Sequence, residues 1–301
     1  MLESCADLPD EAFLDVLVSF KGLLRDLNID ADNDGPATIA SSPRLASHQR
    51  QLSTAGAITG VSQDMRLNAF VIENMIKLIE HNSNRLLVNS PKASGWDVIV
   101  DALISVLSAQ DFEPELRLKS ASGLSDLFGI TSDSDIPEED RQRVRQLGLA
   151  ALTRQVKSLY RRGINDSKPS KACELDIHWL SLEALRASLE KYGDTLASGW
   201  NYVFIIIASV FEERAANSER VHQDKADRSS DMLIVHAKSP KLVRSSFGSL
   251  QLICSDFLSS VPQACLQELL VTTHLFCAQH GDFNIALTVS ESWLLIIRFG
   301  C

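Results

Sequence analysis

The sequence predicts an all-α protein, a HEAT- or armadillo-like α-solenoid of antiparallel helix pairs. Apolar residues recur at helical spacing over most of the 301 residues. The chain has only 14 Gly and 9 Pro, too few for an all-β protein, which needs a turn at roughly every 8–12 residues. Two short motifs also occur twice in the same order, and such duplication is typical of tandem helical repeats.

The periodicity divides the chain into an N-terminal helix, a linker and a repeat domain. Residues 1–28 are assigned to the first part because apolar residues recur there at helical spacing: Phe13, Leu14, Leu17, Phe20, Leu24 and Leu27. Residues 29–61 have no periodic apolar face and predict a flexible linker. Residues 62–301 form the predicted repeat domain, with a charged, mobile loop at about 215–237. Its helices are expected near 63–82, 95–110, 114–129, 137–162, 174–192, 197–214, 239–259, 262–280 and 283–298.

The segment 137–162 carries a local concentration of basic residues in an acidic chain. Pro137 and the acidic residues after it suit the start of a helix. Toward its end lie the basic residues of a candidate docking patch for anionic lipid headgroups or an acidic protein: Arg154, Lys157, Arg161 and Arg162, with Lys168 and Lys171 close by in sequence. Basic faces of this kind are common on solvated helices, so an ordinary solvent-exposed face is the favoured interpretation.

The first repeated motif is Ser-Gly-Trp at the start of an apolar helix. It occurs as Ser94-Gly95-Trp96 and as Ser198-Gly199-Trp200. The serine offers an N-cap oxygen, and the glycine permits a sharp entry into the helix. Each tryptophan is interpreted as repeat-core packing between helix layers in preference to an interface anchor.

The second motif is a basic residue followed by Ser, a small residue, any residue and Gly. It occurs as Lys119-Ser120-Ala121-Ser122-Gly123 and as Arg244-Ser245-Ser246-Phe247-Gly248. We expect the small residues and the glycine to allow close approach of two helices. Stacked pairs built in this way bury a continuous core and leave broad outer surfaces exposed.

The motifs of common enzymes and nucleotide-binding proteins are absent from the sequence. It has no Gly-x-Ser-x-Gly elbow, no P-loop and no Gly-x-Gly-x-x-Gly. His274, Cys277 and His280 have helical spacing but lack a clear fourth zinc ligand, so core and helix-end roles are favoured for them. We therefore predict no catalytic residues, no metal and no cofactor.

Charge and hydropathy limit the partners that we expect. A net charge of −10 argues against binding nucleic acid. The six cysteines include no Cys-x-x-Cys pair, which indicates reduced thiols in a cytoplasmic protein. The longest apolar run, 202–211, is too short to span a bilayer, so any membrane association is expected to be peripheral.

The repeated blocks also resemble a known family. SGWNYVFIIIASVFEER and SPKLVRSSFGSLQLICSDFLSSVP are similar to helical regions downstream of the Sec-seven catalytic domain in large Arf guanine-nucleotide exchange factors. Over roughly residues 62–290 the chain resembles the Mon-two (Mon2) family more closely. This resemblance implies a scaffold of endosome-to-Golgi transport, cytoplasmic and peripheral on Golgi or endosomal membranes. The implied partners are Dopey-family proteins, Arf-family GTPases or a phospholipid flippase.

Two other functions fit the same sequence. The chain resembles a regulatory region of an Arf exchange factor, although it has no Sec-seven segment and no Phe-Arg-Leu-Pro-Gly-Glu motif. A generic HEAT-repeat adaptor, such as a nuclear transport receptor, would share the predicted architecture. The preferred hypothesis is a scaffold without enzymatic activity that binds protein partners.

Overall fold

The chain is all-α, and its helices form two compact units. The computed structural model describes residues 8–32, 50–88, 94–110, 112–133, 138–160, 168–212 and 235–290. Unit 1 contains Met1–Ile130 and Ser134–Ile136, and unit 2 contains Thr131–Asp133 and Pro137–Cys301. Extended pairing in the described residues is limited to two isolated bridges in unit 2. The predicted fold class is therefore confirmed.

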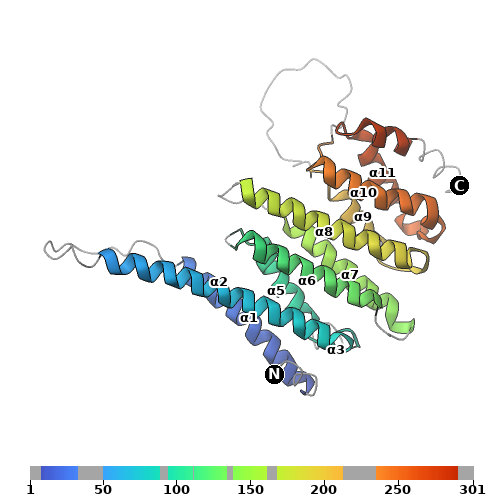
Figure 1. Cartoon of the computed structure of the whole chain (residues 1–301). Coiled ribbons are helices and arrows are strands. Elements are labelled where there is room, and N and C mark those ends of the chain that lie inside the picture. Colours follow the sequence, from blue (N-terminus) through green and yellow to red (C-terminus); the bar gives the residue numbers. More distant parts are fainter. Residues whose placement is uncertain are drawn as a thin grey trace, which may run out of the picture. The chain divides into compact units, whose positions relative to one another are not determined.

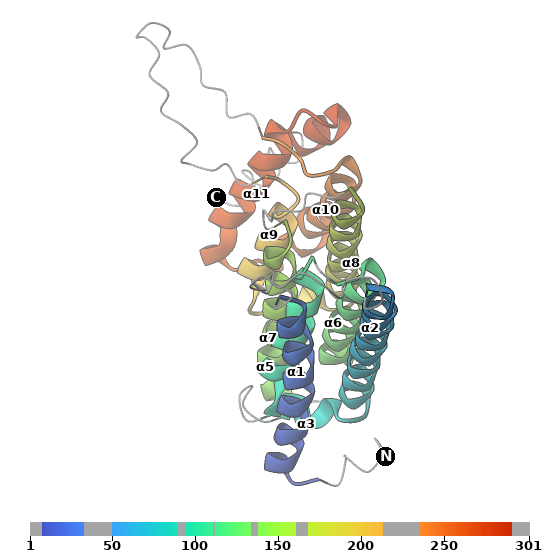
Figure 2. The same cartoon turned by 90° about the vertical axis from the view of Figure 1, so that its left-hand side faces the viewer.

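Unit 1 is built from two layers of helices, α1 and α5 in one and α2 and α6 in the other (Figures 1 and 2). Apolar side chains of all four helices are buried. Polar contacts join the elements at their edges: Lys21 of α1 binds Asp101 of α5 at 2.9 Å, and Arg85 of α3 binds Asp10 of α1 at 2.6 Å. The helices are α1 (Asp10–Asp32), α2 (Arg50–His81), α3 (Ser83–Val88), α5 (Trp96–Ser108) and α6 (Pro114–Asp133).

Unit 2 has the same layered design, with α7, α9 and α11 in one layer and α8 and α10 in the other (Figure 2). Ser246 of α10 donates to the Ile207 carbonyl of α9 at 2.7 Å, which joins the layers. A further helical segment covers 283–290. The helices are α7 (Glu138–Ser158), α8 (Lys168–Tyr192), η2 (Gly193–Thr195), α9 (Trp200–Ala208), α10 (Pro240–Leu252), η3 (Ile253–Phe257), η4 (Leu258–Ser260), η5 (Gln263–Cys265) and α11 (Leu266–Ala278).

The two Ser-Gly-Trp motifs occupy equivalent places in the two units. Gly95 and Gly199 are the N-caps of α5 and α9, with φ of 82° and 94°, a region that L-residues with a side chain rarely adopt. A Cβ on Gly95 would overlap Leu17 of α1, and one on Gly199 would lie 2.8 Å from Leu149 of α7. Helices α1 and α7 therefore have the same position in their respective units.

The tryptophans of these motifs lie in the cores of the units. Trp96 is 2% exposed and Trp200 is 1% exposed. The expected serine N-cap is wrong, because the glycine itself is the N-cap residue. Ser94 lies one residue before the N-cap Gly95, and its Oγ accepts a long hydrogen bond of 3.4 Å from the Trp96 amide. The entry into the helix depends on the glycine conformation, which a serine at that position would not adopt readily.

The two basic-Ser motifs also lie in equivalent helices, α6 and α10. A Cβ on Gly123 would lie 2.7 Å from Ile76 of α2, and one on Gly248 would lie 2.8 Å from Arg186 of α8. Each glycine therefore allows its helix to approach the previous helix of the same layer closely. Together with the glycine contacts of α5 and α9, this shows that each unit contains one copy of a four-helix module: α1–α2–α5–α6 and α7–α8–α9–α10.

The boundaries of several elements differ from those expected. Helix α1 extends to Asp32 and α2 begins at Arg50, so helix covers both ends of the segment 29–61 that was predicted to be a linker. Residues 33–49 lie outside the described residues. Helix α7 ends at Ser158 and not at 162. The predicted division into three domains stays a prediction.

The predicted loop at about 215–237 joins two ends that are hydrogen-bonded to each other. The Glu212 amide donates to the His236 carbonyl at 2.8 Å, and the Lys238 amide donates to the Val210 carbonyl at 2.9 Å. Val235 forms a bridge with Gln279. Residues 235–237 are therefore held in place, and residues 213–234 lie outside the described residues.

Replacing residues 213–234 by a four-residue Gly/Ser linker is expected to preserve the fold. Because the two ends of the loop are already hydrogen-bonded to each other, a shorter connection lowers the entropy cost of loop closure by about 1.5 kcal/mol. Thermal unfolding followed by circular dichroism should show an equal or slightly higher melting temperature. A marked loss of stability would contradict this expectation. Lys238→Ala, which removes a contact at the base of the loop, serves as the destabilised reference.

Candidate docking surface

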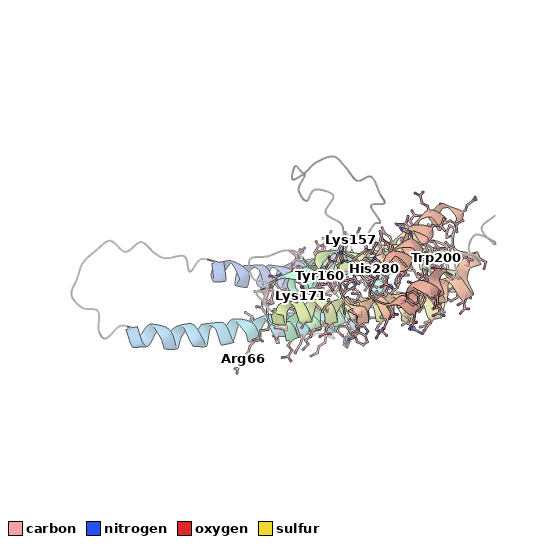
Figure 3. The ribbon with its side chains drawn as sticks, turned by 90° about the horizontal axis from the view of Figure 1, so that it is seen from above. Arg66, Lys157, Tyr160, Lys171, Trp200 and His280 are labelled. Carbon is pink, nitrogen blue, oxygen red and sulfur yellow. The ribbon has the colours of Figure 1, made fainter. Side chains whose placement is uncertain are left out.

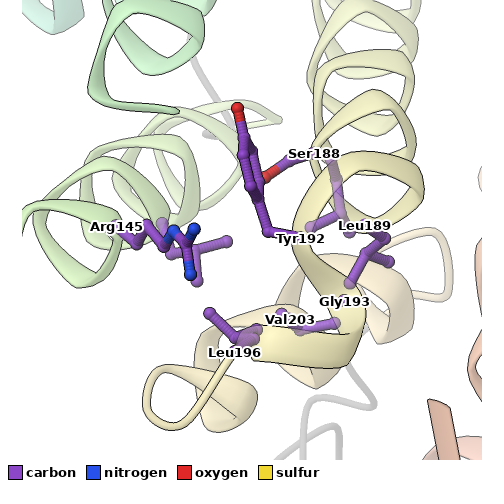
Figure 4. Close-up of a pocket in the computed structure, with 9 residues that line it drawn as sticks. Arg145, Ser188, Leu189, Tyr192, Gly193, Leu196 and Val203 are labelled. Atoms are coloured by element: carbon purple, nitrogen blue, oxygen red, sulfur yellow. The ribbon is translucent and has the colours of Figure 1, made fainter. Parts of the chain in front are cut away.

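The cavity in unit 2 between α7, α8 and α9 is too small for a substrate (Figure 4). Its volume is about 10 Å³, the room of roughly one water molecule. Arg145 lies on its wall with its guanidinium 4.5 Å from the centre of the Tyr192 ring. The same guanidinium donates to the Thr195 carbonyl at 3.3 Å and to the Thr195 hydroxyl at 3.1 Å. Arg145 therefore has structural partners, and the cavity is a small packing gap.

Unit 2 also contains a cluster of polar side chains that the sequence analysis missed, made of Tyr160, His178, Ser209 and Lys238. The Tyr160 hydroxyl lies 3.0 Å from His178 Nδ1, and His178 Nε2 lies 2.8 Å from Ser209 Oγ. Lys238 Nζ donates to the Ser209 carbonyl at 2.6 Å and lies 4.7 Å from the centre of the Tyr160 ring. We call these four residues the His178 cluster.

The His178 cluster has the order of contacts of a nucleophile–base pair but not its chemistry. Burial, and to a smaller degree the charge of Lys238, lowers the pKa of His178 to about 3, so its imidazole is a poor proton acceptor. Burial also raises the pKa of Tyr160. Ser209 Oγ donates to the Ile206 carbonyl at 2.5 Å. None of the four residues lines the cavity described above, so we assign the cluster a structural role.

The cluster holds together the ends of α7 and α9 and the beginning of α10. Tyr160 follows α7 with φ of 59°, an unusual value for a residue with a side chain. His178 is completely buried in α8 and connects Tyr160 with Ser209 at the end of α9. No local sequence signal identifies this set, because its members are separated by long stretches of chain and meet only in the tertiary structure.

Cys254 and Cys277 do not have the properties of a nucleophile. Burial raises the pKa of Cys254 to about 11 and also raises the pKa of Cys277. A cysteine with a raised pKa is almost entirely in the protonated thiol form at neutral pH, and the thiol is a much weaker nucleophile than the thiolate. Within the described part of the chain, no group of three or more His, Cys, Asp or Glu side chains is arranged to hold a metal ion. His274 and His280 are exposed at or near α11.

The candidate docking residues are only partly described. Arg154 is exposed on α7. Lys157 is also exposed on α7, and Lys171 is exposed in the first turn of α8 (Figure 3). Because a single connection joins the two helices, Lys157 and Lys171 lie at the same end of the α7–α8 pair. Arg161 and Arg162 lie outside the described residues, as does the side chain of Lys168. We call Arg154, Lys157 and Lys171 the α7–α8 basic edge.

The basic residues of the second motif have different partners in the two units. Lys119 of α6 forms an ion pair with Glu73 of α2. Arg244 of α10 pairs instead with Asp282, with Nε 3.1 Å from Oδ2, and this contact holds the pKa of Asp282 below its usual range. Both ion pairs are at least partly accessible to water, so their contribution to stability is small. Each ion pair joins two neighbouring helical segments of the same unit and so helps to fix their orientation.

None of the helices in the described part of the chain is long and apolar enough to cross a membrane.

The described residues thus define an all-α helical-repeat protein, and sequence comparison shows which known proteins are similar to it. The chain is 29% identical to the Protein MON2 homolog of Schizosaccharomyces pombe over 214 residues, 69% of this chain. It is 23% identical to Protein MON2 of Saccharomyces cerevisiae over 239 residues, 75% of this chain. The human Protein MON2 homolog is 25% identical over 195 residues. The chain is therefore similar to Mon2 proteins from yeast to human, as the sequence blocks indicated.

The alignments cover only a small part of each relative. The chain spans 12% of the length of the S. pombe protein, 15% of that of S. cerevisiae and 9% of the human protein. No family model matches the chain. No solved structure matches it.

Proposed function

We propose that this chain is a non-catalytic scaffold module of Golgi–endosome traffic that binds protein partners on the outer surface of its helices. The duplicated four-helix module is the observation that supports this proposal most directly. In each copy the glycine and tryptophan signatures are used to pack the helices. The outer faces of the helices are left exposed, as in repeat proteins that bind partners along an extended surface.

The α7–α8 basic edge is the part of this surface that we propose for docking. The edge presents positive charge in a chain with a net charge of −10. An acidic segment of a partner would therefore be attracted to the edge and repelled by the rest of the chain. By family resemblance, the candidate partners are a Dopey-family protein, an Arf-family GTPase or a flippase. Because the edge is exposed, its attraction for a partner should weaken as salt increases.

Charge reversal on the edge is expected to weaken capture of the partner. Lys157→Glu together with Lys171→Glu should reduce binding of a purified Dopey-family protein at least about tenfold, which corresponds to about 1.4 kcal/mol. The matched control is Arg66→Glu together with Lys77→Glu, which makes the same change in charge at two exposed residues of α2. Circular dichroism of both double variants checks that they are folded, and pull-down at two salt concentrations measures binding.

The possible results test separately whether the partner docks at the edge, whether the edge binds lipid, and whether the chain is non-catalytic. Equal loss in both double variants, or no loss in either, would contradict docking at the edge. Binding to anionic vesicles with no capture of the protein would assign the edge to lipid. Nucleotide exchange on a purified Arf GTPase by this chain alone would contradict the non-catalytic role.

A further inference from the structure

The outer helices of the two modules correspond position by position through their glycine contacts. Gly123 of α6 approaches Ile76 of α2, and Gly248 of α10 approaches Arg186 of α8. These two contacts align α2 with α8 and α6 with α10 residue by residue. A side chain that only one of the two modules carries at a given position is therefore not required by the packing that both modules share.

Two residues of unit 2 stand out in this comparison, Trp179 of α8 and Lys241 of α10. Trp179 is half-buried, and Lys241 Nζ lies 4.3 Å from the centre of its ring. In unit 1 the corresponding residues are Ala69 of α2 and Leu116 of α6. Because unit 1 brings α2 and α6 into contact with these smaller or apolar side chains, the aromatic ring and the ammonium group serve something other than the shared packing.

The charge of Lys241 is only weakly neutralised by its own chain. Its side chain is 60% exposed, and the Asp176 carboxylate lies 3.9 Å from Nζ, beyond hydrogen-bond distance. The Asp176 side chain is itself 57% exposed. Such an exposed pair is worth little in water, so a carboxylate from a partner can replace Asp176 at small cost.

Trp179 and Lys241 lie at the same end of unit 2 as the α7–α8 basic edge. Helices α8 and α10 lie side by side and run in the same direction (Figure 1), because Lys241 contacts Trp179 and Ser245 contacts Glu183 further along both helices. The beginning of α10 therefore lies beside the first half of α8. Trp179 is about 12 Å from Lys171 along the axis of α8, a distance that an extended peptide covers with about four residues.

We propose that Trp179 and Lys241 extend the α7–α8 basic edge into a docking site for an acidic protein segment that carries an apolar residue. The apolar side chain covers the exposed part of the Trp179 ring, and a neighbouring carboxylate pairs with Lys241 in place of Asp176. Further carboxylates of the segment, about four residues away, lie at Lys157 and Lys171. This inference rests on the proposed docking function of the edge and adds the residues that select an apolar side chain.

The charges around the site favour a protein segment over an anionic membrane. A bilayer surface presents negative charge to the whole face of the helices, including the exposed Asp176, in a chain with a net charge of −10. A narrow peptide can instead place its carboxylates at the basic residues alone. The half-buried Trp179 ring also offers apolar contact area to a single side chain.

Two synthetic acidic peptides of equal length and charge test the proposal with the full chain. Each carries an aspartate and, about four residues away, a pair of glutamates. A leucine stands next to the aspartate in one peptide and a serine in the other. Fluorescence anisotropy should show that the leucine peptide binds at least about fivefold more tightly, because it buries apolar surface on Trp179.

Variants at Trp179 test the source of this preference. Trp179→Ala should remove the preference for leucine and leave the affinity for the serine peptide within about twofold of that of the unmodified chain. Trp179→Phe should retain the preference, because a phenyl ring still offers apolar contact area. Circular dichroism checks that each variant is folded.

Variants at the charged residues should act on both peptides alike. Lys241→Gln should weaken both at least about threefold, whereas Asp176→Asn should strengthen both, because it removes the carboxylate that competes for Lys241. Lys191→Gln is the matched control for Lys241→Gln. Lys191 also lies over an aromatic ring, with Nζ 5.4 Å from the centre of Tyr192, but it is at the other end of α8. Its replacement should leave both affinities unchanged.

The results distinguish this site from docking at the edge alone. Equal affinity of the two peptides for the unmodified chain, or a leucine preference that survives Trp179→Ala, would overturn the proposal. If Lys157→Glu with Lys171→Glu abolishes binding while Trp179→Ala and Lys241→Gln bind as the unmodified chain does, docking at the edge stands and its extension is wrong. Displacement of both peptides by phosphatidylserine vesicles, without any leucine preference, would assign the charges to lipid and also overturn the proposal.

Discussion

Trp200→Ala is expected to lower the free energy of unfolding by about 3–5 kcal/mol, the usual cost of removing a buried tryptophan. The side chain is 1% exposed, and its indole Nε1 donates to the Leu196 carbonyl at 2.7 Å. It also stacks on Phe204, with ring centres 6.0 Å apart. Alanine would leave a cavity among these groups and remove the hydrogen-bond donor of a buried carbonyl. Urea unfolding followed by circular dichroism measures the loss.

Trp179→Ala is the matched control, because it removes the same side chain from the surface of α8. Trp179 is half-buried and contacts Lys241, so its loss should cost only about 1–2 kcal/mol. Equal destabilisation by the two substitutions would contradict a core role for Trp200. Trp96→Ala should resemble Trp200→Ala, because Trp96 is buried at the equivalent position of unit 1.

The sequence was most informative where local chemistry determines local structure. Glycine before tryptophan predicted the sharp entry into α5 and α9, and both glycines have the positive φ that makes such an entry possible. The small residues of the second motif predicted close helix contact, which Gly123 and Gly248 make. The order of these motifs predicted the repeat before any tertiary contact was known.

The sequence was least informative where residues far apart along the chain determine the structure. His178 lies between Ile177 and Trp179 in an apolar helix, and nothing nearby in sequence indicates that Tyr160 and Ser209 are its partners. The ends of the helices that flank the predicted linker differ from those expected for a related reason. Residues 50–61 have no periodic apolar face but form the first part of α2, because extending a helix costs less free energy than starting a new one.

The stability of the chain is expected to fall as the pH falls below about 6.5, in part because His178 is buried in its neutral form. Its pKa is about 3 in the folded protein against 6.5 for a free imidazole. Between these values the unfolded chain binds a proton and the folded chain does not. Stability from neutral His178 is therefore present above pH 6.5 and is lost at up to about 1.4 kcal/mol for each pH unit below it.

His178→Gln separates this effect from the titration of carboxylates. Glutamine can donate and accept hydrogen bonds toward Ser209 and Tyr160 but cannot titrate, so at pH 7.5 we expect a loss of about 1–2 kcal/mol from imperfect pairing. Because the variant lacks the His178 titration, its stability relative to the unmodified chain should rise by about 2 kcal/mol between pH 6.5 and 4.5, enough to close or reverse the difference. His274→Gln, at an exposed position on α11, should follow the unmodified chain throughout. A constant gap for His178→Gln would show that the imidazole takes up its proton in the folded protein as readily as in the unfolded chain.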